Sequence, residues 1–382
     1  MLKLVPVSLF GLAFNAICNA IFILQIAKTS DSELLAQSMV MWSGFFVAGA
    51  CVAPFENYFL YRRIGETHDE SDNGVVILSS VLFLLVGISL SIAQEASFWI
   101  APLTLLMGIC VGKMIHLRSK AISENKLVRV SLSNSAEGLV RAIVIFVMYR
   151  NYETLNLLLV VTAYLLGNLV SLLPVLNNPS EKELSSLKSF PKSKFYSLSA
   201  IGLVSALITG GLPYIAGFFQ VSSIAPLLFF FTLSRSLLIL QSLLVYVNPE
   251  FAKNLGKQRS LIKLVKFFVP LALFIFLILS AMKNFAEMFL AINLNSIDSL
   301  GILVFSAGLL LSAFFSLSIS TQNSGSRWIN SLYAGVIGLT ASCIVFKAIE
   351  SSQNSFYISM ILAPLFGLIC LSYLDRRSER AE

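Results

Sequence analysis

The sequence predicts an all-α, polytopic integral membrane protein with about 12 transmembrane helices in two six-helix lobes. The first observation is composition: of 382 residues, 57% are hydrophobic and only 12% are charged. A soluble domain carries about 25% charged residues, so this balance indicates that lipid is the solvent. The other two observations are a series of long apolar runs and the distribution of basic residues between them.

Twelve apolar runs are long enough to cross a bilayer, which takes about 20 mostly apolar residues in a helix. Backbone polar groups in hydrocarbon must be paired within the structure that spans it, which leaves helices or a closed barrel. Barrel strands alternate over about 10 residues, and these runs do not alternate. The predicted helices are residues 5–27, 37–60, 75–93, 98–116, 131–149, 155–176, 197–219, 224–247, 264–282, 300–320, 330–348 and 355–374.

Basic residues gather in every second segment between the runs, as the positive-inside rule expects of cytoplasmic segments. If the N-terminus is cytoplasmic, most of the 27 lysines and arginines lie in inside segments, whereas each outside loop holds at most one. Both termini are therefore predicted to be cytoplasmic. The same rule accounts for most of the net charge of +7, so the basic loops indicate contact with membrane lipids and no nucleic acid.

A polar interval rich in Ser, Lys and Pro divides the chain near its middle. We predict an N-terminal six-helix lobe at 1–176, a cytoplasmic linker at 177–195 and a C-terminal six-helix lobe at 196–382. An even number of helices in each half gives both halves the same orientation, as in transporters built from parallel repeats. The segment 283–298 is predicted either as an amphipathic helix on the outer face or as a partial insertion into the membrane.

The sequence lacks the patterns of an enzyme or an ATP-driven pump. The soluble segments are short and contain no Gly-rich phosphate loop. His68 and His116 fall in or beside predicted cytoplasmic loops, without cysteines or carboxylates at metal-ligand spacing. We therefore expect no catalytic residues, no metal and no cofactor. The cysteines all fall inside predicted helices and are interpreted as small apolar residues: Cys18, Cys51, Cys110, Cys343 and Cys370.

Glu137 and Arg141 place opposite charges inside the fifth predicted helix. A charge near the bilayer centre costs at least ~2.5 to 3.5 kcal/mol, so each needs a partner or water. The two residues lie one helical turn apart on the same face. Either they form a self-neutralising structural pair, or they mark a hydrated cavity in which Arg141 binds an anionic ligand and Glu137 restrains it. Exchanging the two residues is expected to be tolerated only by a structural pair.

Arg235 lies about three turns into the eighth predicted helix, with no acidic residue within a helical turn. It either pairs across the bundle with Glu137 or Glu56, or faces water and a negatively charged substrate. The guanidinium suits phosphate because its planar fork donates two parallel hydrogen bonds. Arg235 is therefore a candidate for contact with the substrate.

Amide side chains complete the candidate cavity. Asn15 and Asn19 lie one turn apart on the first predicted helix. Amides at this spacing often form hydrogen bonds between helices, so a structural role and a cavity role both stay open. Weaker candidates with the same ambiguity are Glu56, Asn57, Asn168 and Gln241.

The passage ALITGGLPYIAGFFQVSSIAPLLFFFTLSRSLLILQSLLVYVNPEFAK, together with the two six-helix lobes and the basic central loop, resembles one transporter family. It is similar to the polysaccharide and oligosaccharide-lipid flippases of the multidrug/oligosaccharidyl-lipid/polysaccharide (MOP) superfamily. The resemblance implies two lobes around a central cationic cavity, with Arg235 and Arg141 in that cavity. It also implies transport of an undecaprenyl-diphosphate-linked oligosaccharide across the inner (cytoplasmic) membrane by alternating access. A glycan polymerase or glycosyltransferases are the partners that such a role implies.

Two other functions stay open at this point. One is a cation-coupled multidrug or small-molecule exporter of the same superfamily. Such exporters typically carry a coupling carboxylate in the first helix, where this sequence has Asn15 and Asn19. The other is a non-transporting membrane assembly subunit, in which the polar residues would only join helices.

Overall fold

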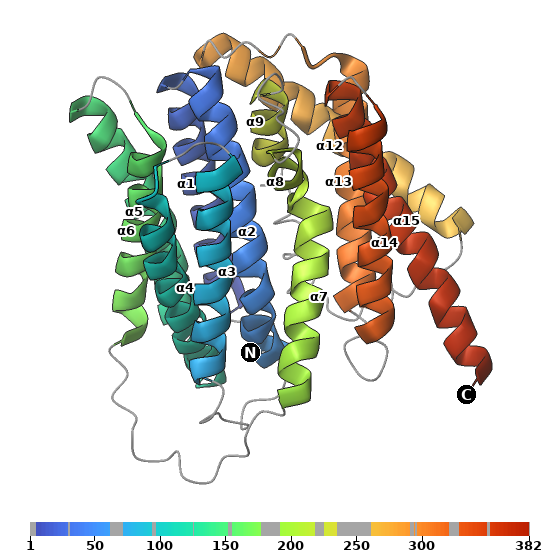
Figure 1. The fold of residues 1–382 in the computed structure, drawn as a ribbon, viewed down its shortest axis with the longest axis horizontal. Coiled ribbons are helices and arrows are strands. Elements are labelled where there is room, and N and C mark those ends of the chain that lie inside the picture. The colour runs from blue at the N-terminus through green and yellow to red at the C-terminus, as the bar shows by residue number, and fades with distance from the viewer. Residues whose placement is uncertain are drawn as a thin grey trace. The chain divides into compact units, whose positions relative to one another are not determined.

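The computed structural model describes residues 5–29, 31–61, 72–93, 97–124, 126–151, 155–176, 192–217, 225–234, 261–290, 294, 296–320, 328–349 and 352–381. Within these ranges every regular element is a helix (Figure 1). The chain splits into two compact units, one of Met1–Ser30 with Gly44–Gly202 and one of Asp31–Ser43 with Leu203–Glu382. The predicted lobe boundaries near 176 and 196 stay a prediction.

The first unit is built around α5, which contacts α1, α4 and α6. α4 also packs against α3 and α6. A side chain on α5 can therefore meet partners from three other helices. The helices, blue to green in Figure 1, are α1 Val5–Thr29, α2 Ser32–Tyr61 from Gly44 on, α3 Asp72–Ala93, α4 Ile100–Ser123, α5 Leu127–Asn151 and α6 Leu157–Leu176.

Aromatic rings fill the interior of the first unit beside α6. The ring of Tyr164 meets the edges of Phe22 on α1 and Phe45 on α2, with ring centroids 5.3 and 5.4 Å apart. Phe45 in turn stacks on Phe83 of α3 at 5.5 Å. Such edge and offset contacts stabilise beyond the burial of area alone. They fix the Tyr164 ring in a defined place.

The second unit is organised around α15, which packs against α13 and α14, while α12 packs against α13. Its core contains fully buried rings of Phe230 and Phe231 on α9. Phe231 meets Phe356 of α15 edge-on, and Phe230 meets Phe305 of α13 in the same way. The helices of this unit are the first part of α2, up to Ser43, α7 Lys192–Gly210 from Leu203 on, α8 Leu212–Gly217, α9 Ala225–Ser234, α12 Leu261–Leu290, α13 Ser299–Ser320, α14 Trp328–Ala348 and α15 Ser352–Ala381.

The helices have the length and apolar surface that a bilayer requires. In the described part of the chain, 10 helices are long and apolar enough to cross a membrane, and two shorter apolar helices accompany them. Each of the twelve predicted runs overlaps a described helix. Large apolar side chains lie on the outside, such as Ile92 at 76% and Leu277 at 65% exposed. An exposed apolar surface of this kind fits lipid as the solvent, which confirms the predicted all-helical membrane fold.

Two predicted segments differ from the structure. The seventh run, 197–219, is interrupted, because α7 ends at Gly210 and α8 begins at Leu212. Pro213 has no N–H to continue the helix, and the hydroxyl of Ser43 donates to the carbonyl of Gly210 at the break. The described residues of the segment 283–298 do not form a helix of their own. Its first part continues α12 to Leu290, and the described residues after it lead into α13.

α4 is longer than the sequence predicts. The apolar run was expected to end at 116, but the helix continues to Ser123. His116, predicted at the end of the helix in or beside a loop, is therefore a half-buried residue within α4. Arg118, which was expected in the cytoplasmic segment after residue 116, is a buried residue of α4. α7 likewise begins at Lys192, inside the end of the predicted linker. The five cysteines lie in helices, as predicted.

Candidate functional site

Three polar side chains line one face of α5. Ser133, Glu137 and Arg141 follow one another at intervals of four residues, which places them in one stripe along the helix. All three are buried, with Glu137 at 8% and Arg141 at 6% exposed. Because α5 contacts α1, α4 and α6, this stripe meets side chains from those helices.

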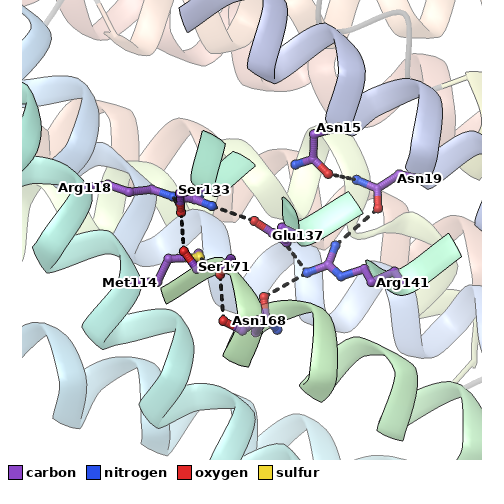
Figure 2. Close-up of polar contacts among 9 residues, drawn as sticks. All are labelled: Asn15, Asn19, Met114, Arg118, Ser133, Glu137, Arg141, Asn168 and Ser171. Carbon is purple, nitrogen blue, oxygen red and sulfur yellow. Dashed lines mark hydrogen bonds and ion pairs between the residues drawn. The ribbon is translucent and has the colours of Figure 1, made fainter. Parts of the chain in front are cut away.

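Glu137 accepts hydrogen bonds from two guanidinium groups (Figure 2). Arg141 Nη2 donates to Oε1 at 2.5 Å, and Arg118 Nη2 donates to Oε2 at 2.9 Å. Arg118 is only 4% exposed. Two cationic donors, one on each oxygen, favour the ionised form of a carboxylate. The pair predicted from the sequence is thus part of a triad.

Arg141 also donates hydrogen bonds to two of the candidate amide side chains. Its Nη2 donates to Oδ1 of Asn168 at 2.9 Å, and its Nη1 donates to Oδ1 of Asn19 at 3.3 Å. Asn19 Nδ2 in turn donates to Oδ1 of Asn15 at 3.1 Å. Five of the candidate residues therefore belong to one hydrogen-bond network, which Figure 2 shows. Their assignment to a binding site stays a prediction.

Arg118 is fixed by a second set of contacts. Its Nε donates to the hydroxyl of Ser133 at 2.8 Å, and this hydroxyl donates to the carbonyl of Ser171 at 2.6 Å. The Ser171 hydroxyl lies 2.7 Å from the carbonyl of Asn168 and 2.9 Å from the sulfur of Met114. These bonds join α4, α5 and α6 around the Arg118 side chain (Figure 2).

The Arg141 guanidinium packs closely against α6. Its Cζ lies 4.4 Å from the centre of the Tyr164 ring, within the range of a cation–π contact. A Cβ on Gly167 would lie 2.6 Å from Arg141 Cγ, so only glycine lets α6 approach this side chain. Arg141 Nε is buried and has no hydrogen-bond partner among the described residues. Within the described ranges, one donor of the network is therefore unsatisfied.

The triad carries one positive charge in excess, because two guanidinium groups share one carboxylate. Within the described ranges, no other carboxylate pairs with Arg118 or Arg141. A buried charge without a counter-charge costs several kcal/mol. The arrangement is therefore suited to accept an anion. It is poorly suited to hold a cation, since both Glu137 oxygens already accept from guanidinium groups.

The remaining candidates cannot be placed in this network. Arg235 and Gln241 lie outside the described residues. Glu56 and Asn57 lie in α2, and their side chains are also outside the description.

The sequence pattern did not identify Arg118 as a site residue, because Lys113, Arg118 and Lys120 lower the hydropathy of the last turns of α4. A signal was present in the two residues that follow. Ala121 and Ile122 are apolar, and the structure buries both in a cluster with Val130 and Val175. They lie seven residues after the buried Met114 and Ile115, a spacing that keeps apolar residues on one helix face and indicates that the helix continues.

Comparison with known proteins gives the fold and no closer relative. No protein family matches the sequence, and no curated protein matches it. Solved structures do match. The MATE transporter VcmN of Vibrio cholerae has a TM-score of 0.52 at 14% identity, over 100% of this chain and 96% of that one. An inward-facing multidrug resistance MATE family transporter of the MOP superfamily has a TM-score of 0.50 at 13% identity, over 95% and 94%. The chain therefore shares the MATE fold.

Proposed function

We propose that this chain is a membrane transporter that flips a polyprenyl-diphosphate-linked oligosaccharide across the cytoplasmic membrane by alternating access. The observation that carries the proposal is the excess positive charge of Arg118, Glu137 and Arg141, buried in a protein with the MATE fold. Glycosyltransferases or a glycan polymerase acting on the same lipid-linked glycan are the partners that this function calls for.

The chemistry of the substrate fits the charge of the triad. A diphosphate is an anion that guanidinium groups bind through paired hydrogen bonds. The prenyl tail needs no polar site because it stays in the lipid, so a few cations within an apolar shell are sufficient. Arg141 donates to three side-chain acceptors, and its Nε has no hydrogen-bond partner among the residues described. It is therefore the residue best placed to donate to the diphosphate.

A cation-coupled drug exporter is the second candidate, and the shared fold with a multidrug resistance transporter favours it. Coupling to sodium or protons requires a carboxylate that can take up the cation. In the described spans, Glu137 already accepts from two guanidinium groups, and α1 offers Asn15 and Asn19 in the place of an acid. These contacts favour an anionic substrate over a coupled cation.

The test is transport by the purified full-length chain in proteoliposomes. A fluorescent polyprenyl-diphosphate oligosaccharide is added, and the fraction of glycan that is accessible to an external lectin is followed over time. We expect protein-dependent exchange of the glycan between leaflets, and no efflux of ethidium from drug-sensitive cells that express the chain. Ethidium efflux without glycan exchange would favour the exporter. The absence of both activities would favour an assembly subunit.

A further inference from the structure

The two arginines of the triad have different surroundings. Arg118 donates from Nε to Ser133, whose hydroxyl is itself held by a backbone carbonyl of α6. Arg141 donates to two amide side chains, and its Nε has no hydrogen-bond partner in the part of the chain that the structure describes. Arg118 is therefore fixed to the helix bundle, whereas Arg141 retains an N–H donor at Nε that could bind a ligand. The two guanidinium groups cannot exchange roles.

The shared carboxylate links these two residues. If Glu137 had only Arg141 as a partner, the two would form a neutral pair. Moving Arg141 to an anion would then leave Glu137 as an unpaired buried charge, at a cost of several kcal/mol. With Arg118 on Oε2, Glu137 keeps a partner at 2.9 Å when Arg141 leaves Oε1. Arg118 thus removes the main cost of releasing Arg141.

We infer that Arg118 is a positioning residue for a phosphate-type oxyanion that binds at Arg141: it holds Glu137 and leaves the triad one positive charge in excess for the anion to neutralise. This inference rests on the proposed function and gives its anion a place. Arg118 does not itself contact the anion. It sets the affinity through the charge that it supplies and the carboxylate that it retains.

The inference makes anion affinity depend on the charge count of the triad. Arg118→Gln leaves a neutral Glu137–Arg141 pair and should weaken anion binding. Arg118→Gln combined with Glu137→Gln removes one further charge, yet restores the single positive excess at Arg141. Arg118→Lys keeps the charge and should bind nearly as the wild type does. Glu137→Gln alone raises the excess and should tighten binding.

The experiment measures the Kd of the purified full-length chain in detergent for inorganic pyrophosphate and for farnesyl diphosphate, with farnesol as the tail-only control. We expect Arg118→Gln to weaken binding at least about tenfold, as the loss of a charged hydrogen bond does. We expect the double variant to return to within about threefold of the wild type. A residue that only holds the helices together would predict further loss in the double variant.

Three results would overturn the inference. They are a wild-type chain that binds neither anion, an Arg118→Gln variant with an unchanged Kd, and a double variant that binds no better than Arg118→Gln. If Arg118→Gln does not fold, the direction of the Glu137→Gln effect decides: tighter binding supports the inference and weaker binding contradicts it. If the pattern holds for both anions, a free diphosphate is sufficient; if it holds only for farnesyl diphosphate, the ligand is lipid-linked.

Transport is measured separately, so that the two proposals can fail independently. If anion binding follows the charge count but no glycan is flipped, the proposed function is wrong and the positioning role of Arg118 stands. If glycan is flipped and both transport and Kd are unchanged in Arg118→Gln, the proposed function stands and the positioning role is wrong.

Discussion

Arg118 donates to Glu137 at 2.9 Å, although 19 residues separate them and they lie on different helices. This contact explains why α4 continues past its apolar run, since a buried arginine there has a carboxylate to meet. A buried ion pair is weak evidence for stability, because desolvation offsets the attraction of the charges. Removing one partner is costly nonetheless. The triad is therefore best tested by single changes that leave a charge behind.

Glu137→Gln should destabilise the protein when no anion is present. It leaves Arg118 and Arg141 without a carboxylate, and loss of one partner of a buried pair costs about 3–5 kcal/mol. We expect a lower Tm of the purified chain, and a larger rise in Tm on adding pyrophosphate than the wild type shows. The control is Glu124→Gln, at a more exposed pair with Lys126, where about 0–1 kcal/mol is expected. Equal shifts for the two variants would contradict the burial argument.

Gly167→Ala should separate α6 from the Arg141 side chain. The new Cβ would lie 2.6 Å from Arg141 Cγ and 3.1 Å from its Nε. Either α6 or the Arg141 side chain must therefore move. Overpacking of this kind costs about 1–3 kcal/mol. Gly49→Ala is the matched control, because a Cβ there meets nothing within 4 Å and alanine favours a helix. Thermal unfolding should show a lower Tm for the first variant only; a loss in both would argue against a specific contact.

The sequence predicts those parts of the site that depend on local spacing. Glu137 and Arg141, like Asn15 and Asn19, lie four residues apart, and the helical period places each pair on one face. Their meeting with Asn168 depends on which helices pack together, and periodicity carries no such information. The contact of Glu137 with Arg118 on α4 likewise depends on helix packing and not on local spacing. The fold follows from run length, whereas the break between α7 and α8 depends on a local Gly210–Pro213 stretch within one run.

The exchange of Glu137 and Arg141 no longer separates a structural pair from a cavity arginine. It would place a guanidinium at position 137, where Arg118 already donates, and two like charges would meet at hydrogen-bond distance. Both interpretations now predict failure of the exchanged protein. The variants Arg118→Gln and Glu137→Gln replace this test, because each changes the net charge of the triad without exchanging a positive for a negative group.

The topology is tested by fusions. Because basic residues gather in the predicted inside segments, we expect both termini to be cytoplasmic. A green fluorescent protein fused after Glu382 should fluoresce, and alkaline phosphatase at the same point should be inactive. A truncation after Arg150, in a predicted outside loop, should give the opposite result and serves as the control. Phosphatase activity at the C-terminus would contradict the helix count or the orientation.

Asn168→Asp should neutralise the triad without removing any of its members. Asn168 is 1% exposed and accepts from Arg141 at 2.9 Å, so an aspartate there adds a second carboxylate for the two guanidinium groups. The paired charges should keep or raise the Tm. They should also hold Arg141 in place and weaken anion binding at least about tenfold, because the excess charge is gone.

The control for this change is Asn156→Asp at the start of the same helix. Asn156 is exposed, and its Oδ1 accepts from the backbone N–H of Leu159. Aspartate serves equally well as an N-cap, so this variant adds a carboxylate to α6 without disturbing its start. We expect an unchanged Kd for pyrophosphate. A stable Asn168→Asp protein that still binds the anion as the wild type does would show that excess charge does not determine affinity, and the triad would then serve only to join α4, α5 and α6.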